Sequence, residues 1–291
     1  MGGSIRQRAS ACAAALLLLG ACGARGHGHA SEPSPGLADR LTVAVAAGSF
    51  IMGSDLRERA FAVALGRARP GATARAVREE RPRRRRTLPA YRIQAVPVTG
   101  RDYARFLADT GGREPFVPAA LWRTWGSALP AKLVAAASWS GGEPPPGREA
   151  HPVVLVAQDE AAAYCAWWGR RLGGTGRLPS EAQWEKAARG EGGRIFPWGE
   201  RYEPARLNDA RSGPGTTTAV GSYPEGASPY GALDMAGNVF EWTRTGDAAA
   251  GFVVKGGAFV SGPAHARAAA RHLRPGATLH PAIGFRCVLE P

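Results

Sequence analysis

The sequence predicts an α+β domain with much irregular backbone. Three helices are legible from their caps and apolar spacing, and two short apolar runs near the C-terminus are typical of strands. The chain holds 39 Gly and 23 Pro, concentrated between and after the helices, so loops should be long there. At 291 residues and 44% hydrophobic, it can bury a full core.

Each predicted helix lies between a capping residue and a glycine. The boundaries are Thr99 (with Asp102) to Gly111, Asp159 to Gly173, and Ser180 (with Gln183) to Gly190. The predicted strands are "FVVKGGAFV" at 252–260 and "IGFRCVL" at 283–289. These elements would belong to one domain covering residues 41–291.

The N-terminus is typical of a secretory signal. A basic start is followed by an apolar run at 13–19, which is too short to span a bilayer. The "LGAC" that ends at Cys22 resembles a bacterial lipobox, so we expect a signal peptide at 1–21 and lipid on Cys22; an ordinary signal with a chance Cys is the alternative. Residues 22–40 then form a flexible tether. In a two-membrane cell this indicates a lipid anchor in the outer membrane, facing the periplasm or the outside.

The formal charge of +13 is partly local, because "RPRRRR" covers Arg81–Arg86. This run could contact anionic lipid headgroups or an acidic partner, but a solvated loop is the favoured interpretation. Nucleic acid is not an expected partner, because the chain carries an export signal and no recognition motif.

Two cysteines remain for the folded part once Cys12 leaves with the signal and Cys22 takes lipid. They are Cys165 and Cys287, an even pair in an oxidising compartment, so a disulfide is expected. Two buried free thiols are the alternative.

Several segments in order resemble the formylglycine-generating enzyme (sulfatase-modifying factor) family over about residues 41–290. They are "AAGSFIMGS", "YRIQAVPVTGRDYARFL", "RLPSEAQWEKAARG", "FPWGE", "DMAGNVFEW", "KGGAF" and "GFRC". The resemblance implies a compact fold of low regularity, related to C-type lectin-like domains. It also implies a paired cystine at Cys165 and Cys287, and structural calcium.

The calcium positions that the resemblance implies carry the oxygen ligands that calcium prefers. One site would use the carboxylates of Asp234 and Glu241 and the carbonyls of Gly237 and Val239. The alternative is a turn in which the two acids are surface charges. A second site would use Asn208 and the Asp209 carbonyl, with its other ligands between Arg211 and Thr218.

The catalytic cysteines of the family are missing. Family oxidases bind copper(I) with two Cys in the stretch that here runs from Gly256 to Arg271, and soft copper(I) requires such thiolates. Direct register places Ser261 and Ala266 at those positions, and no Cys occurs between Cys165 and Cys287. Copper is therefore not expected.

The other candidate groups in and near this stretch also have simple structural explanations. His265, His272 and His280 could hold a divalent metal, although loop histidines are more often surface or hydrogen-bonded groups. Ser261 and His265 have the spacing of a nucleophile and base, but no oxyanion hole is identifiable. The arginines of the region should brace irregular backbone, with an anionic pocket as the alternative: Arg267, Arg271 and Arg286. Phe240 stands where an aromatic lines the family's peptide cleft.

These features favour a non-oxidase binding or scaffold module in the cell envelope, with a peptide or protein partner. The alternative is a divergent enzyme, like periplasmic relatives that mature siderophore precursors. A true sulfatase-activating oxidase is disfavoured by the missing thiols.

Overall fold

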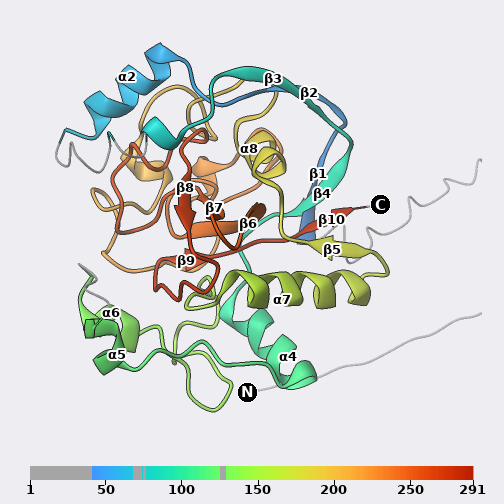
Figure 1. The fold of residues 1–291 in the computed structure, drawn as a ribbon, viewed down its shortest axis with the longest axis vertical. Helices are drawn as coiled ribbons and strands as arrows, with labels where there is room; N and C mark the ends of the chain where they lie inside the picture. The colour runs from blue at the N-terminus through green and yellow to red at the C-terminus, as the bar shows by residue number, and fades with distance from the viewer. Residues whose placement is uncertain (1–40, 68–73, 75–76, 125–128, 291) are drawn as a thin grey trace, which may run out of the picture. The chain divides into compact units, whose positions relative to one another are not determined.

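The computed structural model describes residues 41–67, 74, 77–124 and 129–290, shown in Figure 1. The predicted signal peptide at 1–21, the tether at 22–40 and the lipidation site Cys22 lie outside the described residues. Within the described part, no helix is both long and apolar enough to cross a bilayer. The elements form the mixed helix and sheet domain that the sequence predicts.

The first sheet joins the two ends of the described chain. Its antiparallel order is β1 (Thr42–Val45), β4 (Tyr91–Gln94), β10 (Val288–Glu290) and β5 (Thr175–Arg177). Val45, Ile93 and Val288 are buried beneath Trp184 of α8. Strand β4 therefore joins the first described strand, β1, to the last, β10, so that residues distant in sequence share one sheet.

The second sheet is a ribbon of β2 (Gly48–Met52) and β3 (Arg84–Leu88), antiparallel with Phe50 opposite Arg86. The interpretation of Arg81–Arg86 as a solvated loop is wrong for the backbone of its last three residues. The last three arginines begin β3, although their side chains remain exposed. Helix α2 (Leu56–Leu65) precedes β3 and lies at the same end of Figure 1.

The third sheet has the order β8 (His272–Arg274), β7 (Gly251–Lys255), β6 (Phe240–Asp247) and β9 (Ile283–Gly284), with β6 and β9 parallel. Both predicted strands are shorter than expected. The first ends at Lys255, because Gly256 and Gly257 turn the chain with φ values of 92° and 74°. The second divides into β9 and β10, since Arg286 between them serves a buried ion pair instead of a ladder.

The three predicted helices are confirmed as α4 (Gly100–Thr110), α7 (Gln158–Arg171) and α8 (Glu181–Arg189). Thr99 and Ser180 accept hydrogen bonds from the backbone N–H groups of Asp102 and Gln183, as the capping boxes require. Gly111 and Gly190 end α4 and α8. Helix α8 is buried along its whole length, including its charged residues, so those charges need internal partners.

The remaining helical segments are short: α5 (Ala119–Thr124), α6 (Ala131–Ala135) and the 3-10 turns η1 (Pro204–Arg206) and η2 (Pro224–Gly226). The main core lies between α4, α7 and the third sheet, where Tyr103, Tyr164 and Phe285 pack ring against ring at 5.3–6.2 Å. The disulfide between Cys165 and Cys287 lies in this core, as predicted, and joins α7 to the segment before β10.

Candidate functional site

The loop after β7, from Gly256 to Arg271, corresponds to the stretch that holds the catalytic cysteines in the family. Its path depends on a close approach at the start. A Cβ on Gly257 would lie 3.0 Å from the backbone of His265 and Ala266, so the two arms of the loop pack directly on each other. Glycine is thus required at 257 both for its positive φ and for space.

Neither residue at the family's cysteine positions offers a reactive group. The Ser261 hydroxyl accepts from the Ala258 N–H at 2.8 Å and donates to the Ala258 carbonyl at 3.0 Å. It is therefore engaged in holding its own turn. Ala266 is fully buried in an apolar cluster with Phe196 and Leu207. The loop presents a locked hydroxyl and a methyl group where thiolates would be needed.

Two of the three histidines contact each other, His265 within this loop and His272 at the start of β8. His265 Nδ1 and His272 Nε2 are 3.1 Å apart, and the His272 ring also packs edge-on against Phe240 at 5.3 Å. Burial, together with the neighbouring His265 and Arg274, lowers the pKa of His272 well below its ordinary value. His272 is consequently neutral at pH 7. One of the two facing ring nitrogens carries the proton of this hydrogen bond, and the other accepts it.

His280 lies apart from this pair. Its Nδ1 accepts from the Ala282 N–H at 3.1 Å, and its ring packs on Trp122. Burial lowers the pKa of His280 to about 4. The three histidines therefore do not form a common site, and the pair at 265 and 272 is the part of that expectation that the structure retains.

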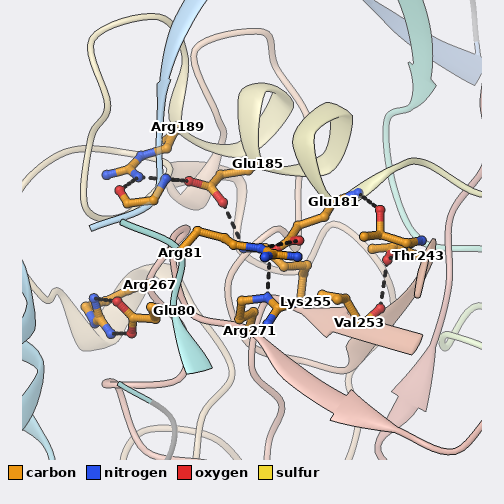
Figure 2. A network of polar contacts seen from close by, with 12 residues as sticks. Glu80, Arg81, Glu181, Glu185, Arg189, Thr243, Val253, Lys255, Arg267 and Arg271 are labelled. Carbon is orange, nitrogen blue, oxygen red and sulfur yellow. Dashed lines mark hydrogen bonds and ion pairs between the residues drawn. The ribbon is translucent and has the colours of Figure 1, made fainter. Parts of the chain in front are cut away.

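The arginines of the region brace the fold, as the sequence analysis favoured. Arg267 pairs with Glu80 and, at 3.5 Å, with Glu58, while Arg271 donates to Glu181 at 2.7 Å. Figure 2 shows Glu80 from the segment before β3 and Glu181 from α8 beside Arg267 and Arg271 of the loop. The guanidinium groups are buried and engaged, so they do not line an anionic pocket.

The same network continues through α8. Glu185 accepts from Lys255 and Arg189, both at 3.0 Å (Figure 2). Arg189 also donates to Glu58 at 3.2 Å. Burial would raise the pKa of Glu185, but Lys255 and Arg189 outweigh it and hold that pKa below its usual value. Burial instead raises the pKa of Glu58, although Arg189 and Arg267 oppose that rise. The floor of the loop is thus a buried, hydrogen-bonded network of acids and bases. Sequence reasoning missed its acids, since no local pattern tells which Glu meets which Arg.

The first predicted calcium set is only partly available. Both oxygens of Glu241 accept from Arg286 at 2.7 Å, and Trp184 adds a third hydrogen bond. Asp234 accepts from the Gly221 N–H, and burial raises its pKa to about 6. Asp234 and Asn238 both have positive φ, so the loop that carries Gly237 and Val239 is tightly bent. This geometry leaves the Glu241 carboxylate committed to a cation of the protein itself.

The second predicted set fits a hard cation better, although with an oxygen of the Asp209 side chain, because the Asp209 carbonyl that was predicted accepts from the Gly213 N–H at 2.9 Å. Asn208 Oδ1, Asp209 Oδ2 and Thr218 Oγ1 are buried oxygens without a hydrogen-bond partner. The Asn238 side chain connects two of these residues, because its Oδ1 lies 3.4 Å from Asn208 Nδ2 and it forms hydrogen bonds with the Thr218 backbone. Buried oxygens left without donors are what an oxygen-liganded ion would satisfy. Across the described residues, however, no three His, Cys, Asp or Glu side chains gather as a metal cluster.

A hollow borders the loop on the side of Phe259. It is also lined by Trp139, Pro144 and a polar group in which Arg148 donates to Thr217 Oγ1 at 2.9 Å. His151 joins this group through Thr217. Phe240, where a peptide cleft was expected, is only 9% exposed and faces His272.

Comparisons with known proteins agree with these features. A family model described as "Sulfatase-modifying factor enzyme 1-like domain" matches residues 30–291. The formylglycine-generating enzyme of Mycobacterium tuberculosis is 30% identical over 290 residues, covering 73% of this chain and 92% of that protein. The mouse (Mus musculus) protein named inactive C-alpha-formylglycine-generating enzyme 2 is 31% identical over 312 residues, covering 94% and 91%.

Among solved structures, PvdO from Pseudomonas aeruginosa is similar with a TM-score of 0.63 at 23% identity. The match covers 86% of this chain and 94% of that one. At this identity the likeness concerns the fold.

Proposed function

The chain belongs to the formylglycine-generating enzyme (sulfatase-modifying factor) family, and we propose that it acts within it as an exported, lipid-anchored binding or scaffold module instead of an oxidase. The observation that carries this proposal is the loop from Gly256 to Arg271. Its Ser261 hydroxyl is locked to the backbone and its Ala266 methyl is buried. Neither can hold copper(I) or form a bond to a substrate thiol.

The sulfur chemistry of the rest of the domain supports the same proposal. The two cysteines of the described chain are bonded to each other in the core, so they supply no thiolate. The similarity to a mouse protein whose name calls it inactive is a further support, since that protein matches nearly the whole chain.

Export and anchoring rest on the N-terminal sequence. The basic start, the apolar run and the "LGAC" before Gly23 favour a lipoprotein, and a disulfide suits an oxidising compartment. Metabolic labelling with a clickable palmitate checks this: label should enter the protein and disappear in Cys22→Ser. Label that persists in Cys22→Ser would contradict the anchor.

Calcium is proposed as a structural ligand at Asn208, where the buried oxygens of Asp209 and Thr218 also lack donors. It would close the irregular segment before β6 by supplying the charge that these oxygens need. No catalytic role follows from it.

The partner of the module is proposed to be a peptide or protein of the envelope, bound over the hollow beside Phe259, where the half-buried Arg148 and His151 meet apolar walls. Pull-down of the chain from solubilised membranes, with and without excess isolated domain as competitor, should recover a partner that the competitor displaces.

The central test is an assay with a Cys-x-Pro-x-Arg peptide, copper(I) and oxygen, analysed by mass spectrometry. We expect an unchanged peptide, while an active formylglycine-generating enzyme run in parallel converts it. Formylglycine in the product at any level above the metal-only blank would overturn the proposal.

A second candidate, a divergent enzyme, is favoured by one observation, the His265 and His272 pair beneath the loop. A neutral imidazole hydrogen-bonded to a second one can relay a proton. Copper or iron at one equivalent per chain, lost in His272→Ala, would support this candidate. Calcium alone would support the binding module.

A further inference from the structure

A cationic face is formed where α2 meets β3. Residues 83–86 are four consecutive arginines, all exposed, and Arg57 is exposed near the start of α2. Arg83 pairs with Asp55 at 3.2 Å and Arg85 donates to Ser49 Oγ. Among the described residues, Arg84 and Arg86 have no ion-pair partner. The side chains of Arg84 and Arg86 leave β3 on the opposite side from that of Arg85, so the arginines lie on both sides of the ribbon. We call Arg57, Leu56 and Arg83–Arg86 the arginine face.

An apolar side chain stands within this face. Leu56 is 84% exposed, the highest value of the large hydrophobic residues that the structure describes, and it directly follows Asp55. Asp55 is tied to Arg83, and Ser54 pairs with Pro82, so the start of α2 lies against the arginine strand. Val63, seven residues further on and thus on the same side of the helix, is also exposed.

We propose that the arginine face docks on an anionic phospholipid surface. Guanidinium groups bind phosphate strongly, and clustered basic residues are attracted to anionic headgroups. An exposed Leu among them suits insertion at the headgroup boundary, where apolar side chains of interfacial helices lie. An acidic protein partner would use the arginines but gives no role to a protruding Leu56.

The location of this surface rests on the proposed lipid anchor. Headgroup binding would then orient the domain, with the end that carries α2 and β3 toward the membrane. Figure 1 shows α4 and α7 away from that end.

Protection of an open strand edge is the competing explanation of the arginines. Basic residues on an edge strand discourage pairing with other chains. This explains Arg84–Arg86 on β3, but it predicts no affinity for lipid. It also gives no reason for Leu56 to remain exposed on the neighbouring helix.

The test uses the full chain with Cys22→Ser, so that no acyl group contributes, in flotation with vesicles. Phosphatidylcholine vesicles are compared with vesicles containing 30% phosphatidylglycerol. We expect binding to the anionic vesicles above the neutral background, falling as NaCl rises from 50 to 300 mM. Arg84→Gln, Arg85→Gln and Arg86→Gln together should lower the partition coefficient at least about tenfold, since each basic group contributes roughly fivefold.

The matched control removes the same charge elsewhere: Arg101→Gln, Arg105→Gln and Arg170→Gln, all exposed on α4 and α7. It should change the partition coefficient less than about twofold. Leu56→Ser should weaken binding to anionic vesicles without changing net charge. Equal losses in both triple variants, or no preference for anionic vesicles, would overturn the proposal. Neither result bears on the peptide assay or on acylation of Cys22, so the proposed function is tested separately.

Discussion

At the scale of single residues, Asn208 shows how a side chain can be placed for a ligand. Its Oδ1 is buried without a donor, while its Nδ2 donates to the Thr216 carbonyl at 2.9 Å. Orientation is thus fixed by the amide nitrogen, and the oxygen is left for an ion. Gly213 makes this possible, because a Cβ at that position would lie 1.8 Å from Asn208 Oδ1.

Gly213→Ala should therefore remove the stabilisation of the domain by calcium. The added methyl displaces the Asn208 oxygen, so the midpoint of thermal unfolding should fall and no longer rise when calcium is added. Differential scanning fluorimetry with CaCl2 or with EGTA measures this. Gly192→Ala, where a Cβ meets nothing within 4 Å, is the control and should keep the calcium response. A calcium response retained in Gly213→Ala would exclude Asn208 as a ligand.

His280 makes the stability depend on pH in a predictable direction. Its pKa is lowered to about 4 from an unfolded value near 6.5, because burial disfavours the charged ring. The stability it preserves is present above pH 6.5 and is lost as pH falls toward 4, by roughly 2–3 kcal/mol. Urea unfolding at pH 7, 5 and 4 should show this loss in the wild type and a smaller one in His280→Asn. If the free energy of unfolding fell equally with pH in both proteins, the acid sensitivity would belong to other groups.

At the scale of elements, buried ion pairs bind the loop after β7 to α8 and to the segment before β3. Arg267 and Glu80 are both buried, and their ion pair joins residues that are separated by most of the domain sequence. Removal of Arg267 leaves the buried Glu80 carboxylate without its partner and typically costs about 3–5 kcal/mol, whereas removal of Glu80 leaves Arg267 paired with Glu58 at 3.5 Å and should cost less. Urea unfolding should show the full loss in Arg267→Ala and a smaller one in Glu80→Ala.

The double variant completes this test. It should be destabilised by clearly less than the sum of the single variants, because neither charge is then left alone. Arg171→Ala removes an exposed pair with Asp109 and should cost at most about 1 kcal/mol. Additive losses at 80 and 267 would mean that the two side chains are not coupled.

The sequence predicts elements well where local chemistry decides them. The caps at Thr99 and Ser180 and the glycines after α4 and α8 act within one turn, so the helices are where they were expected. Strand β3 was missed because four arginines in a row carry no apolar alternation, and only its pairing with β2 makes it a strand. The acids at 58 and 80 were likewise hidden, since their partners Arg189 and Arg267 are distant in sequence.

At the scale of the whole molecule, the disulfide connects what the sheets alone hold weakly. Cys165 and Cys287 are 122 residues apart, and the second lies just before β10, the three-residue strand between β4 and β5. On the chain-entropy model, a closed loop of this length stabilises the fold by about 5 kcal/mol. The loss on reduction should be global, because β10 pairs with β4, which in turn holds β1.

Cys165→Ala with Cys287→Ala should therefore lower the free energy of unfolding by about 3–5 kcal/mol, and reduction of the wild type by dithiothreitol should do the same. Hydrogen exchange would report where the loss occurs. Amides of β1, β4 and β10 should become less protected together with α7, because one cross-link serves both the sheet and the helix. If only α7 lost protection while the sheet kept its own, the sheet would be stable without the cross-link. The domain would then owe its closure to α8 and the buried ion pairs beneath it.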